Sequence, residues 1–173
     1  MPLMSIPSLM TMPTDFFNEG PEPLAPLTDE AVKTVRVALS IDFPTSYLSF
    51  LRHRNGGYIK YNLHPTDEPR RRGLRGSPVP VRGIAGIANG SRSYDIVELT
   101  ADMKGWGVDT GRFVALDGEG HYWICFDKQQ LNDDGEPTIA YVSSESGGAG
   151  PIAHCTIASS FEAFVQGLQR DDD

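Results

Sequence analysis

A chain of 173 residues, of which 39% are hydrophobic and 9% aromatic, carries enough apolar material for one domain with its own core. Its formal net charge of −8 argues against a nucleic-acid-binding protein, because phosphate backbones require clustered positive charge. The two cysteines, Cys125 and Cys155, are too few for a disulfide scaffold, so we expect reduced thiols and a cytoplasmic protein.

The first 27 residues are rich in proline, which donates no backbone hydrogen bond to a helix or a sheet. We expect residues 1–27 to form an irregular arm that folding does not need. Prolines at positions 2, 7 and 13 interrupt the apolar residues near the start, which is not typical of a signal peptide. No stretch approaches the roughly 20 apolar residues that a membrane-spanning helix needs, so we expect no membrane span.

One domain is predicted for residues 28–170, and it begins with two helices. Thr28 is a suitable N-cap, and Asp29 and Glu30 lie favourably in the first turn of the helix that follows. A second helix begins at Pro44, a residue that suits the first helical position. We expect this helix to end where glycine can adopt a left-handed conformation, at Asn55, Gly56 and Gly57.

The middle of the chain has weaker patterns. Residues 58–61 are typical of a short strand, and residues 94–99 form an element whose type the sequence leaves open. Residues 64–83 contain four prolines and three glycines together with arginines at 70, 71, 72, 75 and 82. We expect a long exposed loop here, and a binding arm is the alternative to a simply solvated one.

The last third predicts an antiparallel meander followed by a helix. Three strands with turns at 117–120 and 132–135 are expected, over residues 112–116, 121–126 and 138–142. Ser159 and Glu162 have the spacing of a capping box, and apolar residues then recur at helical spacing, at Phe161, Phe164, Val165 and Leu168. Residues 171–173 are expected to form a frayed acidic tail.

Three blocks in this order resemble the SUKH superfamily of Smi/Knr-like proteins: FPTSYLSFLRHRNGG at 43–57, GEGHYWICFD at 118–127 and IASSFEAFVQGL at 157–168. The residues that carry the resemblance are Pro44, Tyr47, Asn55, Gly56, Gly57, Gly120, Trp123, Asp127, Ser160, Phe161 and Phe164. The resemblance implies an α+β fold with a central, mostly antiparallel twisted sheet flanked by helices. The chain departs from the family pattern at Phe43, where leucine is usual, in the arginine-rich loop and in the proline-rich arm.

The resemblance also implies a function. Many members of the superfamily are cytoplasmic immunity proteins that bind and neutralise bacterial toxins such as nucleases, and yeast relatives regulate cell-wall synthesis. We therefore expect a non-enzymatic protein-binding domain whose partner is a basic toxin domain. A regulatory or scaffold protein without a toxin is the alternative within the binding class, and a small hydrolase that uses cysteine and histidine is the alternative from another class.

Four side chains are candidates for a metal site or a nucleophile: His121, Cys125, His154 and Cys155. His121 and Cys125 share one face of a predicted strand, but the adjacent His154 and Cys155 would point to opposite faces. No third group orients a Cys–His pair, and the Asn-Gly-Gly run is not followed by the Lys-Ser/Thr of a phosphate-binding loop. We expect no metal, no cofactor and no catalytic residue, and two buried structural thiols.

Acidic residues dominate the end of the chain, where residues 113–173 carry eleven acidic and two basic side chains. Singly, the acids of the predicted turns are solvated side chains, but together they are expected to form one negative surface that attracts a basic partner. We expect Trp123 in the core. The predicted partner-binding residues are Trp106 and the acids Asp117, Glu119, Asp127, Asp133, Asp134 and Glu136.

Overall fold

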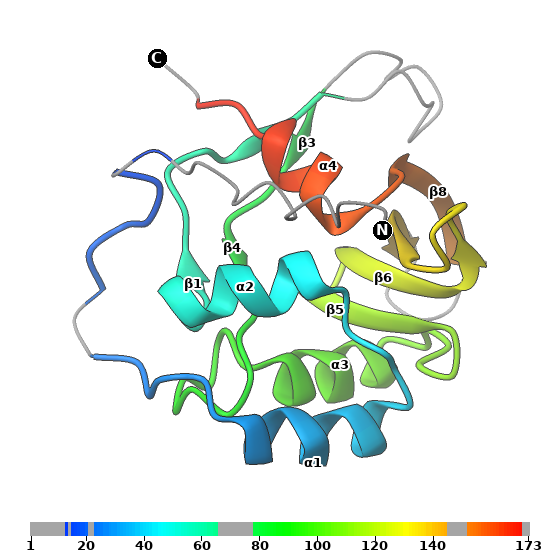
Figure 1. Cartoon of the computed structure of the whole chain (residues 1–173). Helices are drawn as coiled ribbons and strands as arrows, with labels where there is room; N and C mark the ends of the chain where they lie inside the picture. The colour runs from blue at the N-terminus through cyan, green and yellow to red at the C-terminus, as the bar shows by residue number, and fades with distance from the viewer. Residues whose placement is uncertain (1–12, 14, 21–22, 66–77, 145–151, 171–173) are drawn as a thin grey trace, which may run out of the picture.

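The computed structural model describes residues 13, 15–20, 23–65, 78–144 and 152–170. Its centre is a four-stranded antiparallel sheet whose strands follow one another in chain order, namely β5 (Phe113–Gly118), β6 (Tyr122–Leu131), β7 (Pro137–Ser144) and β8 (Ile152–Ala158) (Figure 1). The described residues also form two short antiparallel pairs, β1 (Gly57–Tyr58) with β4 (Gly83–Ile84) and β2 (Leu63–His64) with β3 (Val79–Pro80).

The helices of the described chain are α1 (Asp29–Leu39), α2 (Thr45–His53), α3 (Ile96–Gly105) and α4 (Phe161–Gln166). Figure 1 shows α1 and α3 on one side of the sheet and α4 on the other, with α2 crossing in front. This arrangement confirms the predicted α+β class. The element of open type at residues 94–99 is the start of α3, which Asp95 caps by accepting from the amide of Val97 at 2.9 Å.

Aromatic rings join α2, β6 and α4 into the core. The ring of Tyr47 packs edge-on against Phe126 at 5.2 Å and against Phe161 at 5.1 Å, and Phe50 packs against Phe161 at 5.4 Å. The hydroxyl of Tyr47 donates to the buried carbonyl of Ala85 at 2.6 Å, so this ring also anchors the segment after β4. Trp123 is 1% exposed, as expected of a core residue.

The Asn-Gly-Gly run is not the helix cap that its sequence indicates. Helix α2 ends at His53, and the buried side chain of Asn55 instead exchanges two hydrogen bonds of 2.8 Å with the backbone of Ile87. Gly56 has φ +85°, and a Cβ there would lie 2.5 Å from the amide nitrogen of Gly86. The run therefore fastens the end of α2 to the segment after β4 by close backbone approach.

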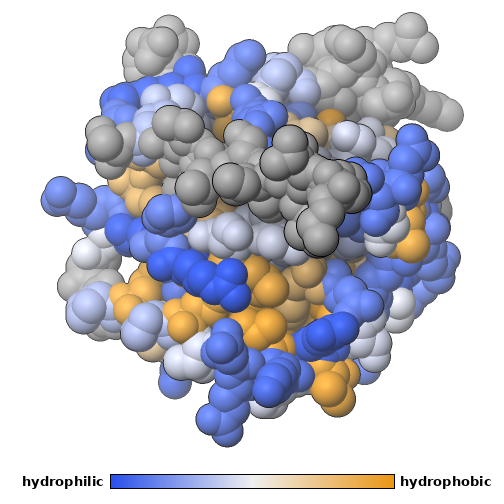
Figure 2. Space-filling view, viewed as in Figure 1, coloured by the Kyte–Doolittle hydropathy of each residue, from blue (hydrophilic) through white to orange (hydrophobic). Residues whose placement is uncertain are grey.

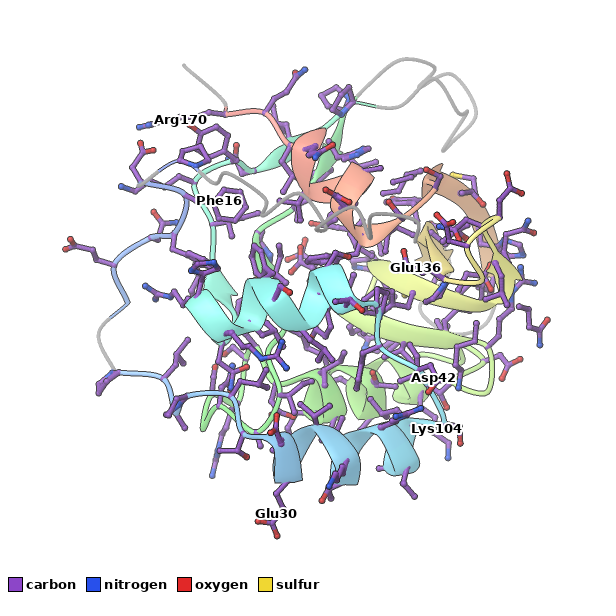
Figure 3. All side chains as sticks on the ribbon, in the orientation of Figure 1. Phe16, Glu30, Asp42, Lys104, Glu136 and Arg170 are labelled. Atoms are coloured by element: carbon purple, nitrogen blue, oxygen red, sulfur yellow. The ribbon has the colours of Figure 1, made fainter. Side chains whose placement is uncertain are left out.

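The N-terminal arm is irregular where it is described, but it does not lie free of the core. Phe16 is 3% exposed and packs against Phe50 at 5.8 Å, while its carbonyl accepts from the amide of Lys60 at 2.8 Å. Asp15 pairs with Arg170 at 2.9 Å, and Figure 3 shows Phe16 and Arg170 on the same side of the molecule. The residues around Phe16 thus pack into the aromatic core, which argues against the expectation that folding does not need this arm.

Four further expectations need correction. Pro44 is the N-cap of α2 rather than its first residue, and the cap of α4 is Ser160, which accepts from the amide of Ala163 at 3.0 Å, rather than Ser159. Strand β8 was not foreseen. The predicted exposed loop at 64–83 contains β3 and the start of β4, and Val79 and Val81 in it are fully buried. Its arginines at 70–72 and 75 lie outside the described residues, as does the predicted tail at 171–173.

Candidate functional site

The predicted acidic surface is divided by the topology of the sheet. Glu119 lies in the turn between β5 and β6, whereas Asp133, Asp134 and Glu136 lie in the turn between β6 and β7. Consecutive turns of an antiparallel meander fall at opposite ends of the shared strand, and the ten residues of β6 span about 30 Å. The expectation of a single acidic surface was therefore wrong.

Asp117 is not a turn residue, and it is not available to a partner. It belongs to β5, is 1% exposed, and accepts hydrogen bonds from the Tyr94 hydroxyl at 3.1 Å and from the Arg82 amide at 2.8 Å. Burial raises the pKa of Asp117 to about 6, although these hydrogen bonds and the Arg82 charge lower it in part. Asp117 therefore connects the residue before β4, the Tyr94 segment and β5 inside the protein.

Asp127 is also internal. Its side chain is 2% exposed and forms a bidentate pair with Arg112, at 2.9 Å to Nε and 2.8 Å to the Nη2 atom. Burial alone would raise the pKa of Asp127, but the hydrogen bonds from Arg112 and from the Gln129 amide outweigh it, and the pKa is lowered. Asp127 closes the β5–β6 pair, so its predicted role in partner binding was wrong.

The β6–β7 turn presents its acids to solvent on a well-ordered loop. The side chain of Asn132 accepts from the amides of Asp134 and Glu136 at 3.0 Å and donates to the carbonyl of Ser159 at 2.9 Å. Asp133 and Asp134 are exposed, and the neighbouring Leu131 is 51% exposed. Figure 3 shows Glu136 on the side of the view opposite Phe16 and Arg170. We refer to residues 131–136 as the hairpin tip.

Trp106 lies at the other end of β6. Its half-buried ring covers Gly120, where a Cβ would lie 2.6 Å from the ring, and it contacts the exposed His121 with ring centroids 5.6 Å apart. Gly120 also has φ +60°, so both its conformation and its neighbour require glycine. Trp106 thus borders the β5–β6 turn and cannot share a local surface with the hairpin tip.

A hollow of about 450 Å³ lies beside the β5–β6 turn, and sequence reasoning did not identify it. Its walls come from β1, the residue before β4, the segment before α3, residues 98–102 of α3, and the end of β5 with the turn that follows. The aromatic and charged residues of its lining are Tyr58, Arg82, Arg92, Tyr94, Glu98, Asp102 and Glu119. No local motif joins them, because they lie in segments that only the fold brings together. We refer to this feature as the tyrosine–carboxylate hollow.

The candidate nucleophile and metal ligands are arranged for neither role. Cys125 is fully buried, its nearest polar contact is the sulfur of Met103 at 3.4 Å, and burial raises the pKa of its thiol, so the reactive thiolate is disfavoured. His121 is exposed, and His154 lies on β8 against the ring of Phe113 at 5.4 Å. Within the described ranges, no three His, Cys, Asp or Glu side chains are grouped so that they could hold a metal ion.

None of the helices in the described parts of the chain is long and apolar enough to cross a membrane.

One of two comparisons with known proteins identifies a family. A search of curated proteins found no significant match. The family model of the SMI1/KNR4 family (SUKH-1) matches residues 26–167, which include every strand of the central sheet and the tyrosine–carboxylate hollow. The chain therefore belongs to the SMI1/KNR4 family (SUKH-1).

Proposed function

We propose that this protein is a non-enzymatic immunity protein that neutralises a basic toxin domain by forming a stoichiometric complex with it in the cytoplasm. Its family, SUKH-1, is one of immunity and regulatory proteins and is not a known enzyme family. Inhibition by complex formation needs a stable, complementary surface and no cofactor.

One observation carries the proposal: the interior side chains Asp117, Asp127 and Cys125, which are candidates for chemistry, have structural contacts instead. Asp117 and Asp127 each hold segments together through hydrogen bonds, and Cys125 is a buried thiol beside Met103. An enzyme of the hydrolase class would need at least a nucleophile and a base within hydrogen-bond reach of each other. What the molecule offers to a partner is its surface, and at a net charge of −8 that surface favours a basic one.

The hairpin tip supports the same view. It presents Asp133 and Asp134 beside the half-exposed Leu131 on a turn that Asn132 holds in place. Fixed charges of this kind accelerate the association of a partner of opposite charge, and an apolar residue beside them favours retention. A regulatory protein without a toxin would use the same surfaces, and the nature of the partner separates the two functions.

Neighbouring genes are searched for a basic toxin domain, and co-expression of that domain with this protein tests the proposal. We expect growth to be restored by the wild-type protein and equally by Cys125→Ala, and a complex of fixed stoichiometry to be recovered by size-exclusion chromatography. Loss of protection in Cys125→Ala, with the variant folded as judged by circular dichroism, would favour the hydrolase. Absence of both protection and complex formation would contradict toxin neutralisation.

A further inference from the structure

The tyrosine–carboxylate hollow combines an aromatic wall with two carboxylates, Glu98 and Asp102, that form no ion pair in the described part of the chain. Tyr58 is 47% exposed, although its ring is fixed by an edge-to-face contact with Tyr94 at 4.6 Å and an interplanar angle of 71°. Tyr94 is 4% exposed and is held in turn by its hydrogen bond to Asp117. Tyr58 therefore presents an aromatic face whose position is held by Tyr94, and tyrosine is one of the residue types that dominate binding energy at interfaces.

Residues 98–102 of α3 form another wall. Glu98 and Asp102 are exposed, lie one helical turn apart on the same face, and form no ion pair within the described residues. Glu98 is favourably placed near the N-terminus of α3, but Asp102 repels it, because like charges at i and i+4 destabilise a helix. No ion pair among the described residues accounts for the acidic side chain of Asp102.

The remaining charges do not neutralise this wall. Arg82 pairs with Glu119 at 2.9 Å, so its positive charge is already matched. The lining holds three carboxylates and two arginines, Arg82 and the exposed Arg92, which gives a net charge of −1. The buried Asp117 behind Tyr94 adds one further negative charge above about pH 6. A concave site with an excess of negative charge concentrates cations.

We propose that the tyrosine–carboxylate hollow receives an arginine side chain of a basic protein partner. A guanidinium group is planar and weakly hydrated, so it stacks on an exposed tyrosine ring while its N–H groups bond carboxylates at its edge. Tyr58 supplies the ring, and Glu98 and Asp102 supply the carboxylates. Lysine presents a compact, strongly hydrated charge that uses the ring less well. The inference rests on the proposed function only in taking the partner to be a basic protein.

Nuclear magnetic resonance with the peptide acetyl-Gly-Arg-Gly-amide as probe tests the hollow without any toxin. We expect saturable shifts of the Tyr58, Tyr94 and Glu98 resonances, and shifts at least fivefold smaller with the uncharged analogue in which citrulline replaces arginine. Glu98→Gln/Asp102→Asn should weaken binding by about tenfold. Asp133→Asn/Asp134→Asn makes the same change in charge at the hairpin tip and should bind the peptide with wild-type affinity.

Several results would overturn the inference. These are equal shifts with arginine and citrulline peptides, wild-type affinity in the folded Glu98→Gln/Asp102→Asn variant, or shifts that map to residues 131–136 instead. Once a partner is identified, its affinity for the two double variants is measured as well. A partner that loses affinity only with Asp133→Asn/Asp134→Asn would remove the hollow from the interface but leave toxin neutralisation standing. Arginine binding that depends on Glu98 and Asp102, without any protection against a toxin, would support the hollow and contradict toxin neutralisation.

Discussion

The buried carboxyl group of Asp117 should make the stability of this protein depend on pH. Its pKa in the folded protein is about 6, against an ordinary value of 3.8. The folded state therefore binds the proton more tightly than the unfolded chain, and folding is favoured while Asp117 is protonated. Stability from this group is fully present below about pH 4 and is lost as the pH rises to 6. Two pKa units correspond to about 3 kcal/mol.

Asp117→Asn removes the charge and keeps the shape. The amide oxygen of asparagine can accept from the Arg82 amide, while its NH₂ group can donate to the Tyr94 hydroxyl, so both contacts can be retained. The free energy of unfolding is measured by urea denaturation from pH 3.5 to 7, with the fluorescence of the buried Trp123 as the signal. The free energy of unfolding of Asp117→Asn minus that of wild type should increase by about 2–3 kcal/mol from pH 3.5 to pH 7.

Only the change of that difference with pH matters, because any constant cost of the substitution cancels. Groups that titrate in both proteins cancel as well. Asp134→Asn makes the same chemical change on the exposed hairpin tip and controls for net charge. A difference that stays constant within about 0.5 kcal/mol between pH 3.5 and 7 would show that Asp117 is as well stabilised in its charged form as in water, which refutes the reasoning from burial.

Two further substitutions test how the core is completed. Phe16→Ala should lower the free energy of unfolding by about 3 kcal/mol, as expected for a buried phenylalanine. As the control, Val37→Ala at a residue 79% exposed should change it by less than about 0.5 kcal/mol. Equal effects of the two substitutions would show that the N-terminal segment does not pack on the core in solution. Gly86→Ala should prevent stable folding or lower the thermal midpoint by more than about 10 °C, because its Cβ would clash with the backbone of Asn55. Gly105→Ala, at the end of α3 with open space around it, should leave the midpoint unchanged or higher, and a similar midpoint for both variants would contradict the close approach.

Local signals in the sequence predicted those elements whose determinants are local. Thr28 accepts from the amide of Ala31 at 3.2 Å and caps α1 as expected, and the aromatic residues of α2 and α4 recur at helical spacing because they pack on one another. Strand β8 escaped detection because its β-formers, Ile152, Thr156 and Ile157, do not alternate with polar residues, and it is a strand because β7 pairs with it.

The errors at Phe16 and Asp117 have a common origin in long-range contacts. A Phe-Phe pair in a proline-rich segment has no periodicity, and Phe16 joins the core through the distant rings of Phe50 and Tyr61. Asp117 precedes Gly118 in a sequence typical of a turn, but an irregularity in the β5–β6 register between Ala115 and Asp117 extends the strand and turns this carboxyl inward. Sequence spacing carries no information on either contact.

The hollow explains why a costly buried charge is present at this position. Asp117 holds the Tyr94 hydroxyl and the Arg82 amide at once, and these two residues form adjacent walls of the hollow, with Tyr94 also fixing the exposed ring of Tyr58. A neutral residue would make the fold more stable at pH 7 but would remove negative charge from behind the aromatic wall. Binding sites commonly trade stability for function in this way. Asp117→Asn should therefore be more stable than wild type at pH 7 and yet bind the arginine peptide less tightly, a combination that a purely structural role for Asp117 would not produce.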